Sequence, residues 1–126
     1  MPTRILLADD QRLFVESLKT VLEHQDSRLQ VIATAENGEE AVRLALELRP
    51  DLVLMDVRMP VMDGVEATRR VRQVSPRSQV VVLTSYHDDV HIFPAIKAGA
   101  LSYLLKDVGP EELAEAVRAA ARGEAM

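Results

Sequence analysis

The stretch Leu52-Val53-Leu54-Met55-Asp56 places four apolar residues in a row and ends in a carboxylate. Uninterrupted apolar runs of this kind are typical of strands that are buried on both faces, as in a parallel sheet. Comparable runs lie before and after it in the chain, at residues 5–8, 31–33, 80–83 and 103–105. The pattern therefore predicts five parallel strands.

Between the apolar runs, the spacing of hydrophobic residues changes to that of helices with one apolar face. Three such segments begin after Gln11, after Gly38 and after the loop that holds Pro60 and Gly64. We expect their apolar stripes to contain Leu13, Phe14, Leu18, Val21 and Leu22, then Ala41, Val42, Ala45 and Leu48, then Val65, Thr68, Val71 and Val74.

A fourth helix is expected to run through Ile92 and Ile96 and to end at a Gly99 cap. Pro94 falls inside that segment, where it would remove a backbone donor. We therefore expect the helix to start late or to bend. Pro94 therefore affects the shape of the surface that this helix forms, and it does not affect the acidic residues at the strand ends.

The fifth helix has the clearest signals, because Pro110 suits its first position and Gly123 would stop it. Its expected apolar stripe contains Leu113, Ala116, Val117, Ala120 and Ala121. Five alternating strand and helix units predict an α/β fold, a doubly wound parallel sheet with helices on both faces. No linker interrupts the 126 residues, so we expect a single domain over residues 1–126.

The composition excludes several classes of function. Fifteen Lys and Arg against 20 Asp and Glu give a net charge of -5, without the basic footprint of a nucleic-acid binder. The chain has no cysteine, which removes disulfides and thiolate metal sites and favours a cytoplasmic location. No apolar run approaches the ~20 residues that a membrane span needs. The run at 5–8 is also too short for the core of a signal peptide.

Polar residues stand at the C-terminal ends of four of the five predicted strands: Asp9 and Asp10, Asp56, Thr84 and Lys106. In a doubly wound sheet, ligands bind beyond these ends, where the strand order reverses. Three carboxylates gathered there would repel one another and raise a pKa unless a cation offset the charge, and Mg²⁺ is the natural partner. The set suits a phosphorylated carboxylate, and Asp56 is the preferred acceptor because it closes a buried strand.

Each of these residues also has an ordinary structural explanation. The acidic pair could cap a helix or form a turn, Asp56 could start a turn, and Thr84 could be a plain strand-end hydroxyl. Lys106 could form an exposed ion pair with Asp107, and Tyr103 alone suits a core position with its phenol reaching solvent. The remaining candidates are expected at the surface, namely His24, His87 and His91, or in packing contacts, namely Met59 and Met62.

Taken together, the chain resembles the receiver domain of bacterial two-component response regulators. The resemblance covers nearly all of residues 3 to 122, and its motifs lie at 5–10, 52–56, 59–64, 82–85 and 99–106. An acidic pair, Asp, Thr and Lys at successive strand ends, in this order, form its most specific element. The resemblance implies the flavodoxin-like strand order 2-1-3-4-5.

The resemblance also implies roles for the acidic residues. Asp56 would be the phosphoacceptor and would receive a phosphoryl group from a phosphohistidine of a sensor histidine kinase. Asp10 would ligate Mg²⁺ directly together with Asp56, Asp9 would act chiefly through water, and Arg58 would offer its backbone carbonyl. The kinase would dock near the first helix and the loops around Asp56. Such a domain is a phosphoacceptor that promotes its own phosphorylation and dephosphorylation, not a classical enzyme.

Three further residues would respond to the phosphoryl group. Lys106 would pair with it, and Thr84 would be pulled towards it. Tyr103 would then turn inward near Thr84 and alter the surface formed by the fourth helix, fifth strand and fifth helix. Such a switch requires two states of similar free energy that the phosphoryl group biases.

Residues 64–68 and 102–107 are most similar to those of NarL/LuxR-type transcriptional regulators, in which a helix-turn-helix domain normally follows. Because the chain ends at Met126, we expect a receiver separated from its output domain, in preference to one that stands alone. Transcription control would then act through a DNA-binding domain that is absent here, while the receiver itself would contact neither DNA nor a membrane. A second receiver is a further candidate partner.

Three other hypotheses stay open at this point. A phosphatase of the haloacid dehalogenase kind would need an Asp-x-Asp pair after the first strand and a cap insertion, and the sequence shows neither. A flavodoxin-like cofactor binder would need a hydroxyl- and glycine-rich loop where this chain has residues 9–12, Asp-Asp-Gln-Arg. A pseudo-receiver would use the fold only for protein contacts.

Overall fold

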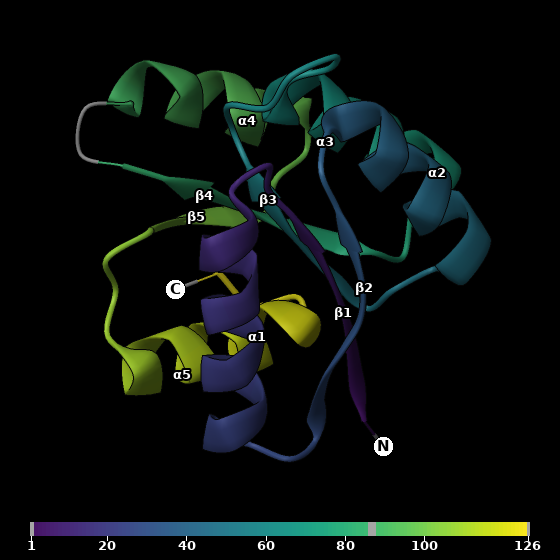
Figure 1. Ribbon diagram of the computed structural model, residues 1–126. Coiled ribbons are helices and arrows are strands. Elements are labelled where there is room, and N and C mark those ends of the chain that lie inside the picture. Colours follow the sequence, from purple (N-terminus) through teal and green to yellow (C-terminus); the bar gives the residue numbers. More distant parts are fainter. Residues whose placement is uncertain (1, 86–87, 126) are drawn as a thin grey trace.

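Five parallel strands form one sheet in the order β2-β1-β3-β4-β5, which confirms the predicted order (Figure 1). The computed structural model describes residues 2–85 and 88–125. The strands are β1 (Thr3–Ala8), β2 (Leu29–Ala35), β3 (Leu52–Asp56), β4 (Gln79–Thr84) and β5 (Ser102–Leu105). The order reverses beside β1 and β3, so the ends of these two strands flank the switch point where ligands bind in such sheets.

Helices cover both faces of the sheet, as predicted (Figure 1). They are α1 (Arg12–Gln25), α2 (Gly38–Leu48), α3 (Gly64–Val74), the short 3₁₀ helix η1 (Asp89–His91), α4 (Ile92–Ala98) and α5 (Pro110–Ala121). Successive residues of each strand point to opposite faces, so Leu7 and Leu54 join the core under α1 and α5. Leu6 and Met55 join the core under α2, α3 and α4. No helix among the described residues is long and apolar enough to cross a bilayer.

One residue of the predicted α1 stripe is wrong, because the side chain of Leu13 is 82% exposed. Leu13 lies five positions before Leu18, which places it about 140° around the helix at about 100° per residue. Val15 is buried in its place, together with Leu18 and Leu22. The buried stripe of α1 therefore contains Val15 and not Leu13.

The fourth helix starts late, as expected from Pro94. The 3₁₀ helix η1 precedes it, and α4 begins at Ile92, so Pro94 lies in the first turn, where a missing N–H costs little. Gly99 caps the other end in the left-handed conformation with φ 118°. Only Ala95 of α4 is buried, so apolar packing anchors this helix weakly.

Two glycines, at the starts of α2 and α3, allow close backbone contacts near the C-terminal edge of the sheet. A Cβ atom on Gly64 would lie 2.0 Å from the carbonyl oxygen of Asp56, and one on Gly38 would lie 2.2 Å from that of Met62. Asp63 caps α3 by accepting a hydrogen bond from the Glu66 N–H at 2.9 Å. These contacts place the loop between β3 and α3 directly against the end of β3.

Candidate functional site

The three predicted carboxylates meet at the C-terminal edge of the sheet. Asp9 and Asp10 follow β1, and Asp56 ends the neighbouring β3. Each of the three offers an oxygen that lies within 4.8 Å of the others. Asp9 and Asp56 are buried, whereas Asp10 is exposed. The strand ends thus bring together the residues that the sequence placed there.

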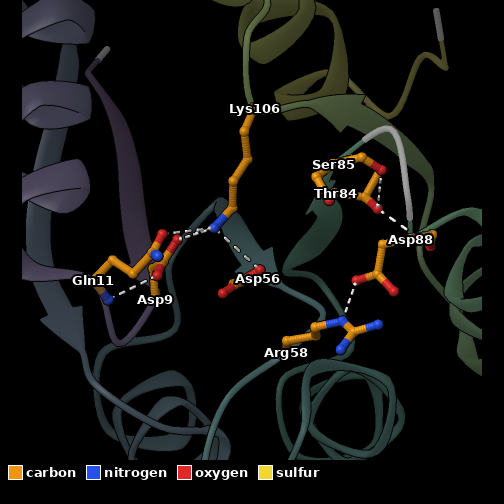
Figure 2. Close-up of polar contacts among 8 residues, drawn as sticks. All are labelled: Asp9, Gln11, Asp56, Arg58, Thr84, Ser85, Asp88 and Lys106. Atoms are coloured by element: carbon orange, nitrogen blue, oxygen red, sulfur yellow. Dashed lines mark hydrogen bonds and ion pairs between the residues drawn. The ribbon is translucent and has the colours of Figure 1, made fainter.

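Lys106 reaches this cluster from the end of β5. Its Nζ donates to Oδ2 of Asp9 at 2.9 Å and lies 3.4 Å from Oδ1 of Asp56 (Figure 2). The same ammonium also donates to Oε1 of Gln11 at 3.3 Å and stands 4.8 Å from the ring centroid of Phe14. The alternative of an exposed Lys106–Asp107 pair is therefore wrong. Lys106 thus contacts two of the three carboxylates, those of Asp9 and Asp56.

This arrangement shifts the pKa of the Asp56 carboxyl. Burial, followed by repulsion from Asp9, raises the pKa of the Asp56 carboxyl from 3.8 to about 6. Attraction from Lys106 and the backbone hydrogen bond with Arg58 oppose the rise without cancelling it. The site is short of positive charge, and clustered carboxylates of this kind fit a small divalent cation that retains several waters.

Asp9 takes part in a turn but does not cap α1. Its Oδ1 accepts a hydrogen bond from the Gln11 N–H at 2.9 Å, while its Oδ2 is bonded to Lys106. The N-cap residue of α1 is Gln11, which makes no side-chain capping bond. The turn orients the Asp9 carboxylate, so Asp9 can form the turn with one oxygen and bind Lys106 with the other.

Thr84 and Tyr103, the two predicted switch residues, differ in their exposure. The Thr84 side chain is buried, and its Oγ1 lies 3.3 Å from the carbonyl oxygen of Ser85 and 3.4 Å from that of Asp88 (Figure 2). Tyr103 is 45% exposed, so its interpretation as a core residue is wrong. Met59 and Met62 pack against the core under α2 and α3, as predicted.

Sequence reasoning missed a second charged cluster close to Asp56. The buried Asp88 accepts a hydrogen bond from Nε of Arg58 at 2.9 Å, and its Oδ1 lies 2.5 Å from Nδ1 of His91. His91 was predicted at the surface, but it is only partly exposed and contacts the buried Asp88. His24 is exposed as predicted, and His87 lies outside the described residues. An acidic residue soon after Thr84, with a histidine three positions later, was the available signal.

Comparisons with known proteins agree with this geometry. The model of the response regulator receiver domain family matches residues 5–118. The transcriptional regulatory protein LiaR of Bacillus subtilis is 47% identical over 121 residues, which cover 96% of this chain and 57% of LiaR. The chain thus spans little more than half the length of this curated relative.

Two solved structures are similar over almost the whole chain. A two-component response regulator of the LuxR family from Aurantimonas is 34% identical, with a TM-score of 0.91, and the match covers 100% of this chain and 90% of that one. The signal receiver domain of NarL from Mycobacterium tuberculosis is 30% identical with a TM-score of 0.91, and 98% of each chain is covered. The NarL/LuxR-type resemblance is confirmed. The chain belongs to the receiver domain family of two-component response regulators.

Proposed function

We propose that Asp56 accepts a phosphoryl group from a phosphohistidine of a sensor histidine kinase. A carboxylate oxygen of Asp56 attacks phosphorus, and the P–N bond to the imidazole breaks as the new P–O bond forms. The imidazole keeps the electron pair of the broken bond and takes up a proton, and Asp56 becomes an acyl phosphate. The observation that carries this proposal is the buried Asp56 carboxylate, 3.4 Å from Lys106 and within 4.8 Å of two further carboxylates.

The donor set supports Mg²⁺ as the cofactor. Asp10 and Asp56 would bind the ion directly, Asp9 chiefly through water, and Arg58 through its backbone carbonyl. When bound, the ion supplies positive charge that neutralises the phosphoryl oxygens. The raised pKa of Asp56 supports this assignment, because the described cluster holds more carboxylate charge than Lys106 balances.

Lys106 and Thr84 would complete the phosphoryl site. Lys106 already contacts Asp56, so its ammonium is in place for a phosphoryl oxygen bonded there. Thr84 would turn its hydroxyl from the Ser85 and Asp88 carbonyls towards the phosphoryl group. Tyr103, which is exposed here, would follow inward and change the surface of α4, β5 and α5. Phosphorylation would thus be converted into a change of surface.

Control of transcription is the proposed output, because LiaR is a transcriptional regulator of which this chain spans 57%. The output would act through a DNA-binding domain, since the net charge of -5 does not favour DNA contact by the receiver. The histidine kinase and a second receiver are the proposed partners. A single receiver domain over residues 1–126 and a cytoplasmic location stay predictions. The chain acts as a phosphoacceptor that promotes its own phosphorylation and dephosphorylation.

Intact-mass measurement after incubation with Mg²⁺ and acetyl phosphate tests the acceptor. The Asp56 carboxylate displaces acetate, and we expect the mass to rise by one phosphoryl group, about 80 Da. Asp56→Asn should show no rise, while Asp26→Asn, at the opposite end of the sheet, should behave as the wild type. Equal labelling of Asp56→Asn would contradict the assignment of the acceptor. No labelling of any of the three would favour a pseudo-receiver.

A further inference from the structure

Asp88 is a buried charged residue that the proposed phosphoryl chemistry does not use. Its carboxylate is 5% exposed and is bonded to Arg58 on one oxygen and to His91 on the other. These bonds, the one from Arg58 first, hold the pKa of Asp88 below its ordinary value, so the carboxylate stays ionised. We call the set of Arg58, Asp88 and His91 the Asp88 bridge.

The Asp88 bridge joins the two loops that flank Asp56 and Thr84. Arg58 lies two residues after Asp56, and Asp88 lies beyond the end of β4, immediately before η1 (Figure 2). The backbone of Asp88 is bonded to the same region, because its N–H donates to the Ser85 carbonyl at 3.0 Å. The carboxylate of Asp88 therefore fixes the position of its own backbone relative to Asp56.

That backbone position supplies one of the two carbonyl oxygens beside the Thr84 hydroxyl, and the other is that of Ser85, 3.3 Å from Oγ1. The Asp88 carbonyl accepts from Oγ1 of Thr84 at 3.4 Å and from the His91 N–H at 3.1 Å. Apolar packing adds little in the following helix, where Ala95 alone is buried. Polar contacts of Asp88 thus help to hold this segment beside Thr84.

We propose that Asp88 is a positioning residue whose bridge to Arg58 keeps the Thr84 hydroxyl turned away from Asp56 and thereby opposes phosphoryl uptake. The inference rests on the proposed function of Asp56. Before Thr84 can donate to a phosphoryl oxygen, its hydroxyl must leave the Ser85 and Asp88 carbonyls, and the Asp88 bridge holds the second of these in place. A contact present only in the turned-away state lowers the population of the competent state, and its removal raises that population.

The first test compares initial rates of phosphoryl uptake from acetyl phosphate in Mg²⁺. Asp88→Ala and Arg58→Ala should each increase the rate by about two- to fivefold, the range expected for a partly exposed ion pair. Asp26→Ala is the matched control, because Asp26 is also nearly buried and is bonded to Arg28 and Arg118 far from the site. Its rate should equal that of the wild type. Should Asp88→Ala fail to fold, Asp88→Asn keeps the side-chain volume and removes the charge.

Epistasis with Thr84 separates positioning from other effects. In a Thr84→Val background, Asp88→Ala should no longer increase the rate, because no hydroxyl remains to be released. An increase that persists there would overturn the proposal and would indicate that the freed Arg58 guanidinium attracts the phosphoryl donor directly. An unchanged or slower rate in Asp88→Ala with Thr84 intact would also overturn it.

A second measurement does not depend on phosphoryl transfer. Threonine-methyl NMR of the unphosphorylated protein should show the Thr84 resonance displaced in the same direction in Asp88→Ala and Arg58→Ala, and unmoved in Asp26→Ala. An unmoved resonance in Asp88→Ala would overturn the proposal even if the protein accepts phosphoryl groups. Conversely, a wild type that takes up no phosphoryl group would contradict the proposed function, while the resonance would still decide the role of Asp88.

Discussion

The two ends of the parallel sheet each hold a nearly buried aspartate beside basic side chains, and the two balance their charge differently. At the C-terminal end, Asp56 shares Lys106 with Asp9. At the N-terminal end, Asp26 is 10% exposed and accepts hydrogen bonds from Arg28 at 3.1 Å and from Arg118 at 3.3 Å.

The pKa values follow these surroundings. Burial and the charge of Asp9 raise the pKa of Asp56 to about 6, while hydrogen bonds from Arg28 lower that of Asp26 to about 2. The ionised carboxylate of Asp26 thus stabilises the folded state, whereas the ionised carboxylate of Asp56 destabilises it. An unbalanced carboxylate in a cleft is typical of a functional site, whereas a fully paired one serves the structure.

The largest change in stability is expected from a substitution in the loop that packs against the C-terminal end of the sheet. Gly64→Ala should lower the free energy of unfolding by about 3 kcal/mol, because the added Cβ would overlap the Asp56 carbonyl. Gly109→Ser is the control, since a Cβ there meets no atom within 4 Å, and it should change stability by less than about 0.5 kcal/mol. Urea denaturation measures both, and equal losses would contradict the close approach at Gly64.

Neutralising the two aspartates should change stability in opposite directions. The folded pKa of Asp56, about 6, lies above its ordinary 3.8, so its stabilising contribution is complete below about pH 4 and is lost as pH rises through 6. Asp56→Asn should therefore gain about 1–2 kcal/mol over the wild type at pH 8 without Mg²⁺.

For Asp26 the sign is reversed. Its pKa of about 2 lies below 3.8, so its contribution is present above pH 3.8 and is lost as pH falls through 2. Asp26→Asn should therefore be less stable than the wild type at neutral pH. Urea denaturation over a pH series measures both variants, and a shift of the same sign in each would remove the proposed difference between the ends.

Adding Mg²⁺ should sharpen the comparison by supplying the missing charge at one end. At ten times the dissociation constant, binding to the folded state adds about 1.4 kcal/mol, which thermal unfolding would detect as a rise in Tm. Asp10→Asn should reduce this rise, because Asp10 is an exposed member of the cluster, and Asp26→Asn should retain it. A full response in Asp10→Asn would exclude that residue as a ligand.

The smallest effect is expected from the ring beside Lys106. Phe14→Leu should cost about 0.5–1 kcal/mol of stability, because the ammonium stands 4.8 Å from the ring centroid in a partly buried setting. Phe93→Leu removes the comparable contact with Lys97 at 5.7 Å on an exposed ring and should cost less. Thermal unfolding compares the two, and an equal cost would argue against a specific contribution of Phe14 at the site.

Hydrophobic periodicity predicted the order and type of the elements well, because strand alternation and helical spacing are local properties. It was less accurate about which residues face inward. Leu13 belongs to an apolar sequence pattern but lies on the outer side of α1, while Val15 is buried. Helix orientation against the sheet, which depends on the packing of α1 beside α5, decided between the two residues.

By itself, the sequence determined the sheet order through its resemblance to a known family, and it determined the acidic cluster through the strand ends. The ends of parallel strands meet at one edge, so Asp9, Asp10 and Asp56 had to be neighbours. Only the tertiary structure decided the contacts of long side chains across that edge. Lys106 binds Asp9 across 97 positions of sequence, and Arg58 binds Asp88 across 30. Such contacts depend on loop paths and side-chain reach, which have no local periodicity to reveal them.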